Sequence, residues 1–350
     1  MRNVYLVRHG HPDFPIGSRI CLGRTDIPLG PLGHLQNVLL ARTFSSMTLS
    51  GVYSSPLHRA YDTACHFSTA PIVHPGLTER ATGLWDGLSF DEIAQRWPAE
   101  YAQRADNPER TMPGGEETSH ACARFSAALQ DILAHSTGDI AIVAHKGVIT
   151  AFLQALQADI PLPKLPYGAY WHLSVENNVL TLKTETPIQP QPLLDRALCL
   201  ALLQAVAPEN VIQHCEAVAV FTQEIAEALP LAFDTTLITQ AALLHDIART
   251  YPDHATLGGQ WLALLGYPSV AAVVRRHHDP LSDVISEASI VAIADNCLQG
   301  AQRVPLRERF AASRKKCQSP EALAAWKKRL VAAESLQKVI NHACGKEIIL

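Results

Sequence analysis

Val4-Tyr5-Leu6-Val7-Arg8-His9-Gly10 is the stretch that decides the fold of the first half of this chain. A short apolar run is typical of a buried strand, and this one ends abruptly in an arginine and a histidine. Open α/β sheets bind their ligands at the carboxyl ends of the strands. Arginine is a permanently charged clamp for phosphate oxygens, and histidine can attack phosphorus and form a covalent intermediate. The stretch therefore predicts a phosphate site that contains a nucleophile.

A second apolar run, Ile140-Ala141-Ile142-Val143-Ala144, also leads directly into a histidine, His145, and a helix is expected to start at the next residue. Residues 51–60 are typical of a short strand, a turn and a helix that carries Arg59 near its start. A helix N-terminus suits a phosphate group. A single histidine at a strand end is explained more simply by local hydrogen bonds. Two such strands, with Arg8 and Arg59 between them, predict a cradle for a tetrahedral phosphoryl group.

These motifs resemble the histidine phosphatase superfamily, also called the phosphoglycerate mutase-like family, over residues 1 to about 185. The matching segments are Leu6–Gly10, Gly23–Leu29, Ser54–Ala60 with Thr63-Ala64, Leu77–Glu79, Pro113–Glu116 and Val143–His145. The resemblance implies that His9 is the nucleophile and forms a phosphohistidine. It implies that Glu79 is the general acid that protonates the leaving oxygen. By the same resemblance, the phosphoryl group is bound by Arg8, Arg59 and His145, and no metal is needed.

Within this superfamily the chain looks most like the α-ribazole phosphatase branch, because of the Gly23–Leu29 stretch and a short helical insertion. The longer insertions of the glycolytic mutases are absent, and a phosphomutase activity is the alternative for this half. Two residues depart from the usual pattern. His11 stands where many members have a glutamate, and Lys146 stands where glycine is frequent. Neither change affects a residue with an implied chemical role, but both could alter which leaving group the site accepts.

Length and composition indicate two ordinary globular domains. The chain has 350 residues, of which 47% are hydrophobic and 18% charged, and a typical domain has roughly 150 residues. The net charge of −4 argues against nucleic-acid binding through a basic surface. No apolar run approaches the roughly 20 residues of a membrane span, and no signal peptide is evident. The eight cysteines form no Cys-x-x-Cys pair, which favours reduced thiols and a cytoplasmic location.

The predicted secondary structure changes from mixed strands and helices to helices alone at a proline-rich stretch. Before it, strand and helix patterns alternate, which predicts an α/β three-layer sheet domain over residues 1–186, with two short strands near its end. Three prolines between residues 187 and 193 indicate a linker. Residues 194–350 show helical periodicity almost throughout, including a predicted helix over 236–250, and are expected to form an all-α bundle.

The helical half has its own cluster of histidines and aspartates. His214 falls on one predicted helix, His245-Asp246 on another and Asp295 on a third. Imidazole and carboxylate groups are ligands for iron, manganese or zinc, and bundles build such sites from facing helices. With 16 histidines in the chain, some must be incidental. However, apolar runs lead directly into His245-Asp246 and into Asp295, and ionisable groups on apolar faces are costly unless they are paired or bind a metal.

This half resembles the HD-domain metal-dependent phosphohydrolases over about residues 194 to 300, in particular the HD-family diadenosine tetraphosphatases. The resemblance implies one metal, held by four side chains: His214, His245, Asp246 and Asp295. It implies a second metal, bridged by Asp246 and also held by His254 and His277. His278 is the competing ligand, and sequence does not resolve the doublet. Arg249 is implied as a phosphate contact. The alternative is a non-catalytic HD domain, kept for binding or regulation.

Taken together, the motifs predict two phosphohydrolase modules in one chain. The first is expected to cleave a small phosphomonoester through a phosphohistidine. The second is expected to hydrolyse a nucleotide or another phosphate ester with the help of divalent transition-metal ions, of which the resemblance implies two. Partners are therefore small phosphorylated molecules rather than nucleic acids or membranes. Residues 319–342 predict an amphipathic helix whose basic triplet, Lys327-Lys328-Arg329, is expected to face solvent.

Overall fold

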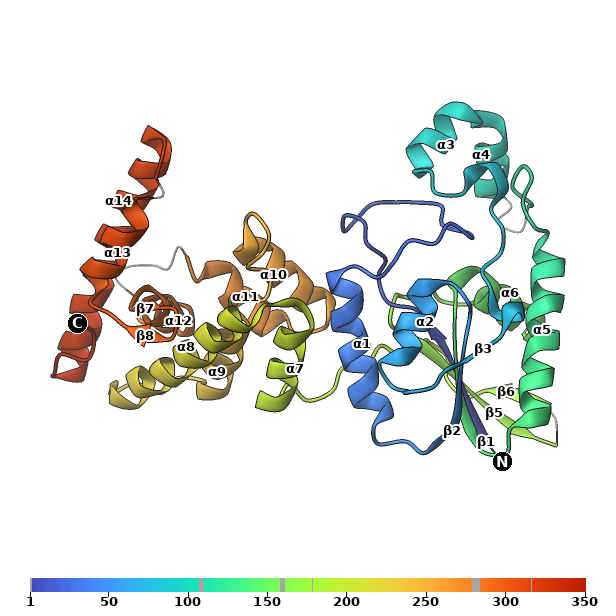
Figure 1. The fold of residues 1–350 in the computed structure, drawn as a ribbon, viewed down its shortest axis with the longest axis horizontal. Coiled ribbons are helices and arrows are strands. Elements are labelled where there is room, and N and C mark those ends of the chain that lie inside the picture. Colours follow the sequence, from blue (N-terminus) through green and yellow to red (C-terminus); the bar gives the residue numbers. More distant parts are fainter. Residues whose placement is uncertain (1, 107–109, 158–160, 178, 279–283, 316) are drawn as a thin grey trace. The chain divides into compact units, whose positions relative to one another are not determined.

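The computed structural model describes residues 2–106, 110–157, 161–177, 179–278, 284–315 and 317–350. The chain divides into two compact units, Met1–Pro192 and Leu193–Leu350. Their elements are labelled in Figure 1. Within the described residues, no helix has both the length and the apolar character that a bilayer span requires.

The first unit is built around a six-stranded sheet with the strand order β3-β2-β4-β1-β5-β6. Its strands are β1 (Arg2–Arg8), β2 (Leu49–Ser54), β3 (Ile72–Val73), β4 (Asp139–Ala144), β5 (Tyr170–Glu176) and β6 (Val179–Leu182). The pairs β1–β4, β4–β2 and β2–β3 are parallel, whereas the pairs β1–β5 and β5–β6 are antiparallel. The register pairs Arg8 with Ala144, so β1 and β4 end level with each other. This places the residues that follow both strands at one edge of the sheet.

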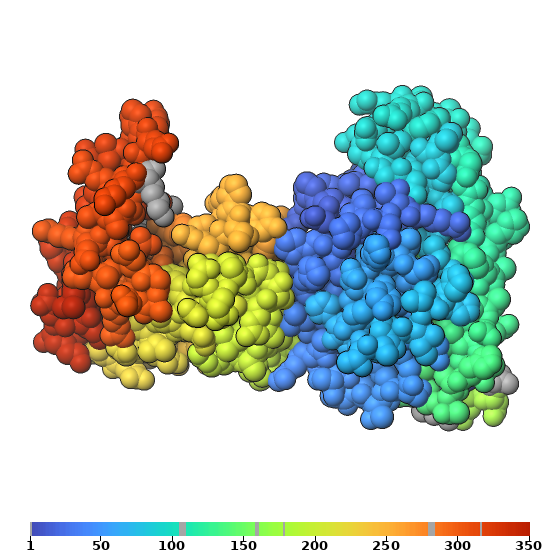
Figure 2. Space-filling view, in the orientation of Figure 1, coloured from blue at the N-terminus to red at the C-terminus, as the bar shows by residue number. Residues whose placement is uncertain are grey.

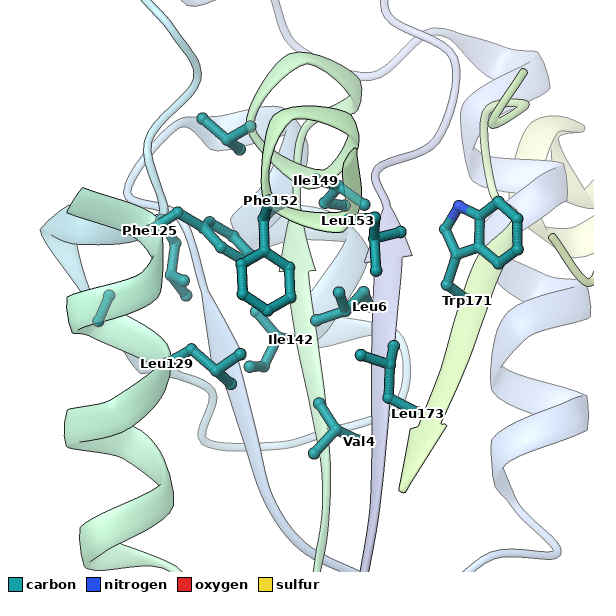
Figure 3. Close-up of a cluster of buried hydrophobic side chains, with 14 of the residues drawn as sticks. Val4, Leu6, Phe125, Leu129, Ile142, Ile149, Phe152, Leu153, Trp171 and Leu173 are labelled. Atoms are coloured by element: carbon teal, nitrogen blue, oxygen red, sulfur yellow. The ribbon is translucent and has the colours of Figure 1, made fainter. Parts of the chain in front are cut away.

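Helices cover both faces of this sheet, as the predicted three-layer α/β class requires (Figure 1). The unit contains α1 (Pro31–Phe44), α2 (His58–Cys65), α3 (Phe90–Arg96), α4 (Pro98–Asp106), α5 (Thr118–His135), α6 (Lys146–Leu156) and the short 3-10 turns η1 (Pro75–Leu77) and η2 (Gly83–Trp85). On one face, Leu6 and Ile142 of the strands pack with Phe125 and Leu129 of α5 and with Phe152 of α6 (Figure 3). Helices α3 and α4 form a raised lobe of this unit (Figure 2).

Alternating residues of the central strands supply the core on the other face of the sheet. Tyr5 and Val7 of β1 pack there with Leu40 and Phe44 of α1 and with Ala60 of α2. Because β1 is buried on both faces, its sequence is a continuous apolar run rather than an alternating one, as expected for a central parallel strand. The two faces together fix the direction of β1 and therefore the position of the residues at its carboxyl end.

The second unit is a helical bundle, as predicted. Its helices are α7 (Arg196–Val206), α8 (Glu209–Ala228), α9 (Thr235–Leu244), α10 (His254–Leu264), α11 (Pro268–Arg276), α12 (Glu287–Asn296), α13 (Leu306–Arg314) and α14 (Pro320–Cys344). One small element was not predicted. Strands β7 (Leu298–Gln299) and β8 (Gln302–Arg303) form a two-stranded hairpin, with Gly300 at its turn in the left-handed region at φ +58°. Only glycine adopts such a backbone without strain.

The predicted helix over residues 236–250 is too long. Helix α9 ends at Leu244, and residues 245–250 form consecutive turns. The backbone N–H groups of Ile247 and Arg249 donate to the carbonyls three residues earlier, at 3.1 and 2.9 Å, rather than four. The ring of His245 also binds the Ala242 carbonyl, at 2.8 Å, which in an α-helix would accept the N–H of Asp246. The histidine side chain thus competes for the carbonyl that would continue the helix, and His245-Asp246 lies in a turn.

Candidate functional site

The first candidate site lies where β1 and β4 end. His9 and His145 directly follow these two neighbouring parallel strands, and the His9 N–H donates to the Ala144 carbonyl at 3.2 Å. Both side chains are buried, and their ring centroids are 5.0 Å apart. The two histidines are 136 residues apart in the sequence. They lie together because β1 and β4 end at the same level of the sheet.

The ring of His9 is held in one orientation by its own loop. Its Nδ1 lies 2.7 Å from the Gly10 carbonyl, which can only accept, so Nδ1 carries the proton and Nε2 keeps its lone pair. Burial, followed by the charges of Arg59 and Arg8, holds the pKa of His9 well below its ordinary value. A neutral imidazole with a free Nε2 is the form that can act as a nucleophile.

His145 has the complementary arrangement. Its Nε2 lies 2.8 Å from the Ser55 hydroxyl, which also accepts the Leu57 N–H at 3.3 Å. A serine hydroxyl can donate its hydrogen to Nε2, and in that arrangement Nδ1 carries the ring proton. Nδ1 is buried and has no hydrogen-bond partner among the described residues. Burial, with His9 and Arg59 nearby, holds the pKa of His145 well below its ordinary value. His145 therefore presents a neutral N–H donor that an anion could accept.

Two arginines are anchored beside these rings, each by only part of its guanidinium group. Arg59, on the first turn of α2, donates from Nη1 to the Thr25 carbonyl at 2.8 Å and from Nη2 to the Gly23 carbonyl at 2.7 Å. Arg8 donates from Nη1 to the Leu165 carbonyl at 2.7 Å. The Nε atom of each arginine is buried and has no partner in the described part of the chain. Unpaired buried donors are costly, so these atoms mark a place for an anion.

The carboxylate of Glu79 sits at the N-terminus of α6, in a loop as predicted. Its Oε1 accepts the N–H groups of Arg80 at 2.8 Å and Val148 at 3.0 Å, and its Oε2 accepts the N–H of Gly147 at 2.8 Å. A Cβ on Gly147 would lie 2.5 Å from Oε1, so only glycine permits this approach. Helix α6 thus fixes Glu79 and begins one residue after His145, which ties the position of the carboxylate to that histidine.

Asp86, a second carboxylate near this loop, organises the backbone of residues 23–25. Its two oxygens accept the N–H groups of Gly23, Arg24 and Thr25 at 2.8 to 2.9 Å. The carbonyls of Gly23 and Thr25 are the acceptors that hold Arg59. Asp86 therefore shapes the loop that positions the arginine.

Sequence reasoning missed Tyr167, which lies at the centre of the site. The Arg8 guanidinium stacks 3.4 Å from the centroid of its ring, and the rings of His9 and His11 are 5.5 and 5.0 Å from it. The signal that could have found it is its place directly before Gly168 and β5, whose N-terminal end lies beside the carboxyl end of β1. Stacking on an aromatic face fixes the arginine without using its N–H donors.

The second candidate site combines residues from most helices of the second unit. His214 lies on α8, His254 starts α10, and Asp295 lies near the end of α12. His245-Asp246 follows α9, and His277-His278 follows α11. The predicted ligands are therefore brought together from five parts of the chain.

Backbone carbonyls orient three of these rings. The Nδ1 atoms of His214, His245 and His277 lie 2.8, 2.8 and 2.6 Å from the carbonyls of Gly300, Ala242 and Val274. Each Nδ1 is thus a protonated atom, and Nε2 is the nitrogen that faces the cluster. In His214 this Nε2 lies 3.0 Å from Oδ1 of Asp295. The Gly300 carbonyl belongs to the turn of the unpredicted β7–β8 hairpin, which explains what this small element does.

The donor atoms converge closely enough to share metal ions. Three groups have ligand atoms that all lie within 4.8 Å of one another: His214, His245 and Asp295; His245, Asp246 and His277; and His254, His277 and His278. The Nε2 atoms of His245 and His277 are buried and have no hydrogen-bond partner among the described residues. Orphaned buried lone pairs fit a metal, because a cation would satisfy all of them at once.

The electrostatics of the cluster favour ionised carboxylates and a neutral His277, whereas Asp295 outweighs burial and raises the pKa of His214. Burial alone would raise the pKa of Asp246, but His245 and His254 reverse this and hold it well below its ordinary value. For Asp295, His214 reverses the same effect of burial. Burial, with His245 and His278 nearby, lowers the pKa of His277 to about 3. Ionised carboxylates and neutral imidazoles are the ligand forms required.

The geometry does not decide whether His277 or His278 is the ligand of the second metal. His277 and His278 both fall in the group with His254, and their ring centroids are 4.0 Å apart. His277 also faces His245, at 5.1 Å between ring centroids. Arg249 lies beside the cluster, with Nε 3.6 Å from Asp246 and Nη1 3.1 Å from Nε2 of His254. Arg249, the predicted phosphate contact, thus lies next to the metal-ligand cluster.

Comparison with known proteins agrees with this division. The model of the histidine phosphatase superfamily (branch 1) matches residues 4–185, and that of the HD domain matches residues 211–299. Phosphoserine phosphatase 1 of Hydrogenobacter thermophilus is 28% identical over 163 residues, which are 45% of this chain and 76% of that protein. Glucosyl-3-phosphoglycerate phosphatase of Mycobacterium tuberculosis is 29% identical over 168 residues, 44% of this chain and 75% of its own.

Among solved structures, YhfR of Bacillus stearothermophilus is similar with a TM-score of 0.50 and 25% identity, covering 54% of this chain and 98% of that chain. The superfamily match takes in more than half of the chain, and the HD match lies entirely within the second unit. The chain is a phosphoric ester hydrolase. It belongs to the histidine phosphatase superfamily, with an HD domain following the phosphatase domain.

Proposed function

We propose that the chain carries two independent phosphohydrolase activities: a metal-free phosphomonoesterase in the first unit and a metal-dependent hydrolase in the second. The single observation that supports the first activity is a free Nε2 on the buried, neutral His9 beside unpartnered donors of Arg8, Arg59 and His145. This is a nucleophile placed against an anion site. The substrate is a small phosphorylated metabolite, in keeping with the printed names of the relatives.

The proposed reaction has two steps. The Nε2 lone pair of His9 attacks phosphorus, the bond from phosphorus to the ester oxygen breaks, and Glu79 gives its proton to the leaving oxygen. Water then attacks the phosphohistidine, Glu79 takes up a proton from it, and inorganic phosphate leaves. Arg8, Arg59 and the Nδ1–H of His145 hold the phosphoryl oxygens throughout and stabilise their growing charge.

Glu79→Gln should slow the hydrolysis of alkyl phosphates by about 10² to 10⁴ fold, because an alkoxide needs a proton to leave. Activated aryl phosphates such as p-nitrophenyl phosphate should lose much less. Steady-state rates on both kinds of ester measure this. Both oxygens of Glu79 accept backbone N–H groups, so the NH₂ group of a glutamine would face one of these donors. Thermal unfolding must therefore show that the variant is folded. Equal losses on both esters would assign Glu79 to binding or structure.

His9 should remain neutral below pH 6.5 in the free protein, because burial and two arginines disfavour its charged form. Its pKa is lowered on folding, so its stabilising contribution is complete above pH 6.5 and is lost as the pH falls towards the lowered value. Nitrogen chemical shifts of the His9 ring should show the neutral Nδ1–H form throughout pH 6 to 8. A titration midpoint at or above 6.5 would contradict the environment described here.

For the second unit, we infer a metal-dependent hydrolase of a nucleotide or another phosphate ester. A divalent ion held by His214, His245, Asp246 and Asp295, with a second ion near His254 and His277, would activate water and polarise the phosphoryl group. The chain's own residues orient the ligand rings through backbone carbonyls and place Arg249 where a phosphate oxygen would bind. Iron, manganese and zinc all suit this donor set.

A panel of phosphate esters and nucleotides, tested with and without metal, examines both proposals. Steady release of phosphate without a bisphosphate cofactor would exclude the alternative of a mutase for the first unit. Chelator-sensitive hydrolysis would support catalysis by the second unit. A second unit that binds metal or nucleotide without hydrolysing any ester would instead be a binding or regulatory domain.

A further inference from the structure

Gly10, which directly follows the candidate nucleophile, is held by side chains from two helices. Its N–H donates to the Thr63 hydroxyl at 3.1 Å, and the N–H of His11 donates to Oε1 of Gln36 at 2.9 Å. Thr63 lies on α2 and Gln36 on α1, and both helices pack on the same face of the sheet. These two bonds hold the peptide groups on either side of Gly10. We call Thr63 and Gln36 together the Gly10 clamp.

The bond to Gln36 sets the direction of the carbonyl that fixes the His9 ring. The His11 N–H and the Gly10 carbonyl belong to one peptide group, which is planar and trans, so a hydrogen bond at the N–H also orients the carbonyl. That carbonyl lies 2.7 Å from Nδ1 of His9. Gln36 therefore acts on the nucleophile through the carbonyl that accepts its Nδ1 proton.

The bond to Thr63 holds the preceding peptide group. The N–H of this group is that of Gly10, and its carbonyl, that of His9, accepts the Gly168 N–H at 3.2 Å. The Thr63 hydroxyl gives its own hydrogen to the Arg59 carbonyl at 2.8 Å, which leaves its oxygen to accept the Gly10 N–H. Because Thr63 is fully buried, it links the helix that carries Arg59 directly to the loop of the nucleophile.

Close contacts leave this loop little freedom to move. A Cβ on Gly10 would lie 2.7 Å from the carbonyl oxygen of Gly33 and 2.9 Å from Oδ1 of Asn37, which both belong to α1. The side chain of Gln36 is packed on the backbone of Gly168, where an added Cβ would lie 2.8 Å from Cβ of Gln36. The Gly10 clamp is thus in place before a substrate arrives, and its geometry needs no ordering during the reaction.

The clamp bears on the chemistry because a neutral imidazole has two tautomers, and only one of them leaves Nε2 free. In water the proton of a neutral histidine side chain prefers Nε2, which is the nitrogen that must attack phosphorus here. The Gly10 carbonyl draws the proton to Nδ1 instead. A carboxylate in its place would also favour the charged imidazolium. A carbonyl held by neutral side chains selects the tautomer without adding negative charge beside His9.

We propose that Thr63 and Gln36 are positioning residues for the phosphatase reaction: by holding Gly10, they keep the proton of His9 on Nδ1 and its Nε2 lone pair available for attack on phosphorus. These roles rest on the proposed phosphohistidine mechanism of the first unit. They assign a part in catalysis to two side chains that act on the substrate only through the His9 ring.

Two substitutions open the clamp from different helices. Thr63→Val keeps the shape of the side chain but removes the acceptor of the Gly10 N–H, and Gln36→Met does the same for the N–H of His11. Each should slow the formation of the phosphoenzyme in a single turnover about tenfold, in keeping with the loss of one hydrogen bond. The inhibition constant of inorganic phosphate should change by less than twofold, because the residues that bind the phosphoryl group are unaltered.

Two further variants separate positioning from a general loss of structure. Thr63→Ser restores the hydroxyl and should restore the rate. Thr43→Val is the matched control, because the Thr43 hydroxyl also donates to a carbonyl four residues earlier, that of Leu39 at 2.9 Å, but lies near the C-terminal end of α1. It should leave the rate of phosphorylation unchanged.

Nitrogen chemical shifts of the His9 ring in the full chain give a readout that does not depend on activity. The His9 signals are identified by their absence in His9→Ala. The wild type, Thr63→Ser and Thr43→Val should show the proton on Nδ1 alone. Thr63→Val and Gln36→Met should show a mixture of both tautomers, since the Gly10 carbonyl is then free to turn away.

An unchanged tautomer in the folded clamp variants would overturn the assignment, even if their activity fell. Equal losses of phosphate binding and of phosphorylation would overturn it as well. The two substitutions lie on different helices, so the test stands if thermal unfolding shows that one of them is not folded. If the variants shift the tautomer but the wild-type chain forms no phosphoenzyme, the phosphohistidine mechanism itself is wrong. If the wild-type chain forms it and the variants form it at the same rate, only the role of the clamp is wrong.

Discussion

Replacing His9 with alanine should abolish the phosphomonoesterase activity of the first unit, with a loss of roughly 10⁴-fold or more, as for the removal of other covalent nucleophiles. The reason is that His9 is buried directly at the carboxyl end of β1, with a free Nε2 lone pair and with Arg8 and Arg59 near its ring. His145 cannot substitute for it, since its Nε2 is bonded to Ser55 and its Nδ1 carries a proton. Rates on a simple alkyl phosphate measure the loss.

The same variant should also lose the covalent intermediate. Rapid acid-free denaturation during turnover of a ³²P-labelled ester should trap acid-labile phosphate on the wild-type chain and none on His9→Ala. Because the ring is buried, thermal unfolding must show that the variant is folded, and His9→Gln is a second variant that fills more of the space. Near-wild-type turnover in either folded variant would rule out the phosphohistidine mechanism.

Replacing Asp246 with alanine should remove most of the bound metal and with it the hydrolase activity of the second unit. Its carboxylate lies 3.0 Å from Nε2 of His254 and 3.6 Å from Nε2 of His245, between the two ends of the ligand cluster. The resemblance implies that Asp246 is a ligand of both metal ions, so its removal weakens both metal sites at once. Elemental analysis of the purified protein, together with chelator-sensitive hydrolysis, measures both effects.

The first unit should be unaffected by this change, since its chemistry uses no metal. A chelator should act in the same way as Asp246→Ala, silencing the second activity and sparing the phosphomonoesterase. Glu224→Ala, which removes an exposed carboxylate of the same unit that pairs with Arg303, is the matched control and should retain its metal. A wild-type chain that holds no metal after expression in supplemented medium would contradict the proposal. Loss of phosphomonoesterase activity in Asp246→Ala would show that the two sites are coupled.

The arrangement of the first site could be predicted because its residues end regular elements. The apolar runs before His9 and His145 can only be buried strands, and parallel strands in one sheet end at the same edge. Arg59 followed from a helix start in the same way. Tyr167 and Ser55 were not found, because a loop residue that stacks on an arginine or fixes a tautomer leaves no periodic signal in the sequence.

In the second unit, the ligand types were readable but their placement was not. The apolar run before His245 predicted a continuing helix, yet the side chain of this histidine takes the carbonyl that the helix needs. The β7–β8 hairpin, whose Gly300 carbonyl orients His214, is two residues long on each side and too short to predict. Lys327, Lys328 and Arg329 of α14 are exposed, as the sequence predicted.

By itself, the sequence determined the fold class of each half, the change of texture between them and the residue types that carry the chemistry, because hydrophobic periodicity and strand-end residues are local properties. Only the tertiary structure decided which nitrogen of His9 is free, which donors of Arg8 and Arg59 remain unpaired, and that residues of α13 and α14 line one cavity with the metal-ligand cluster. These are consequences of contacts between residues far apart in the chain. They depend on packing, and packing is settled only when all elements are in place.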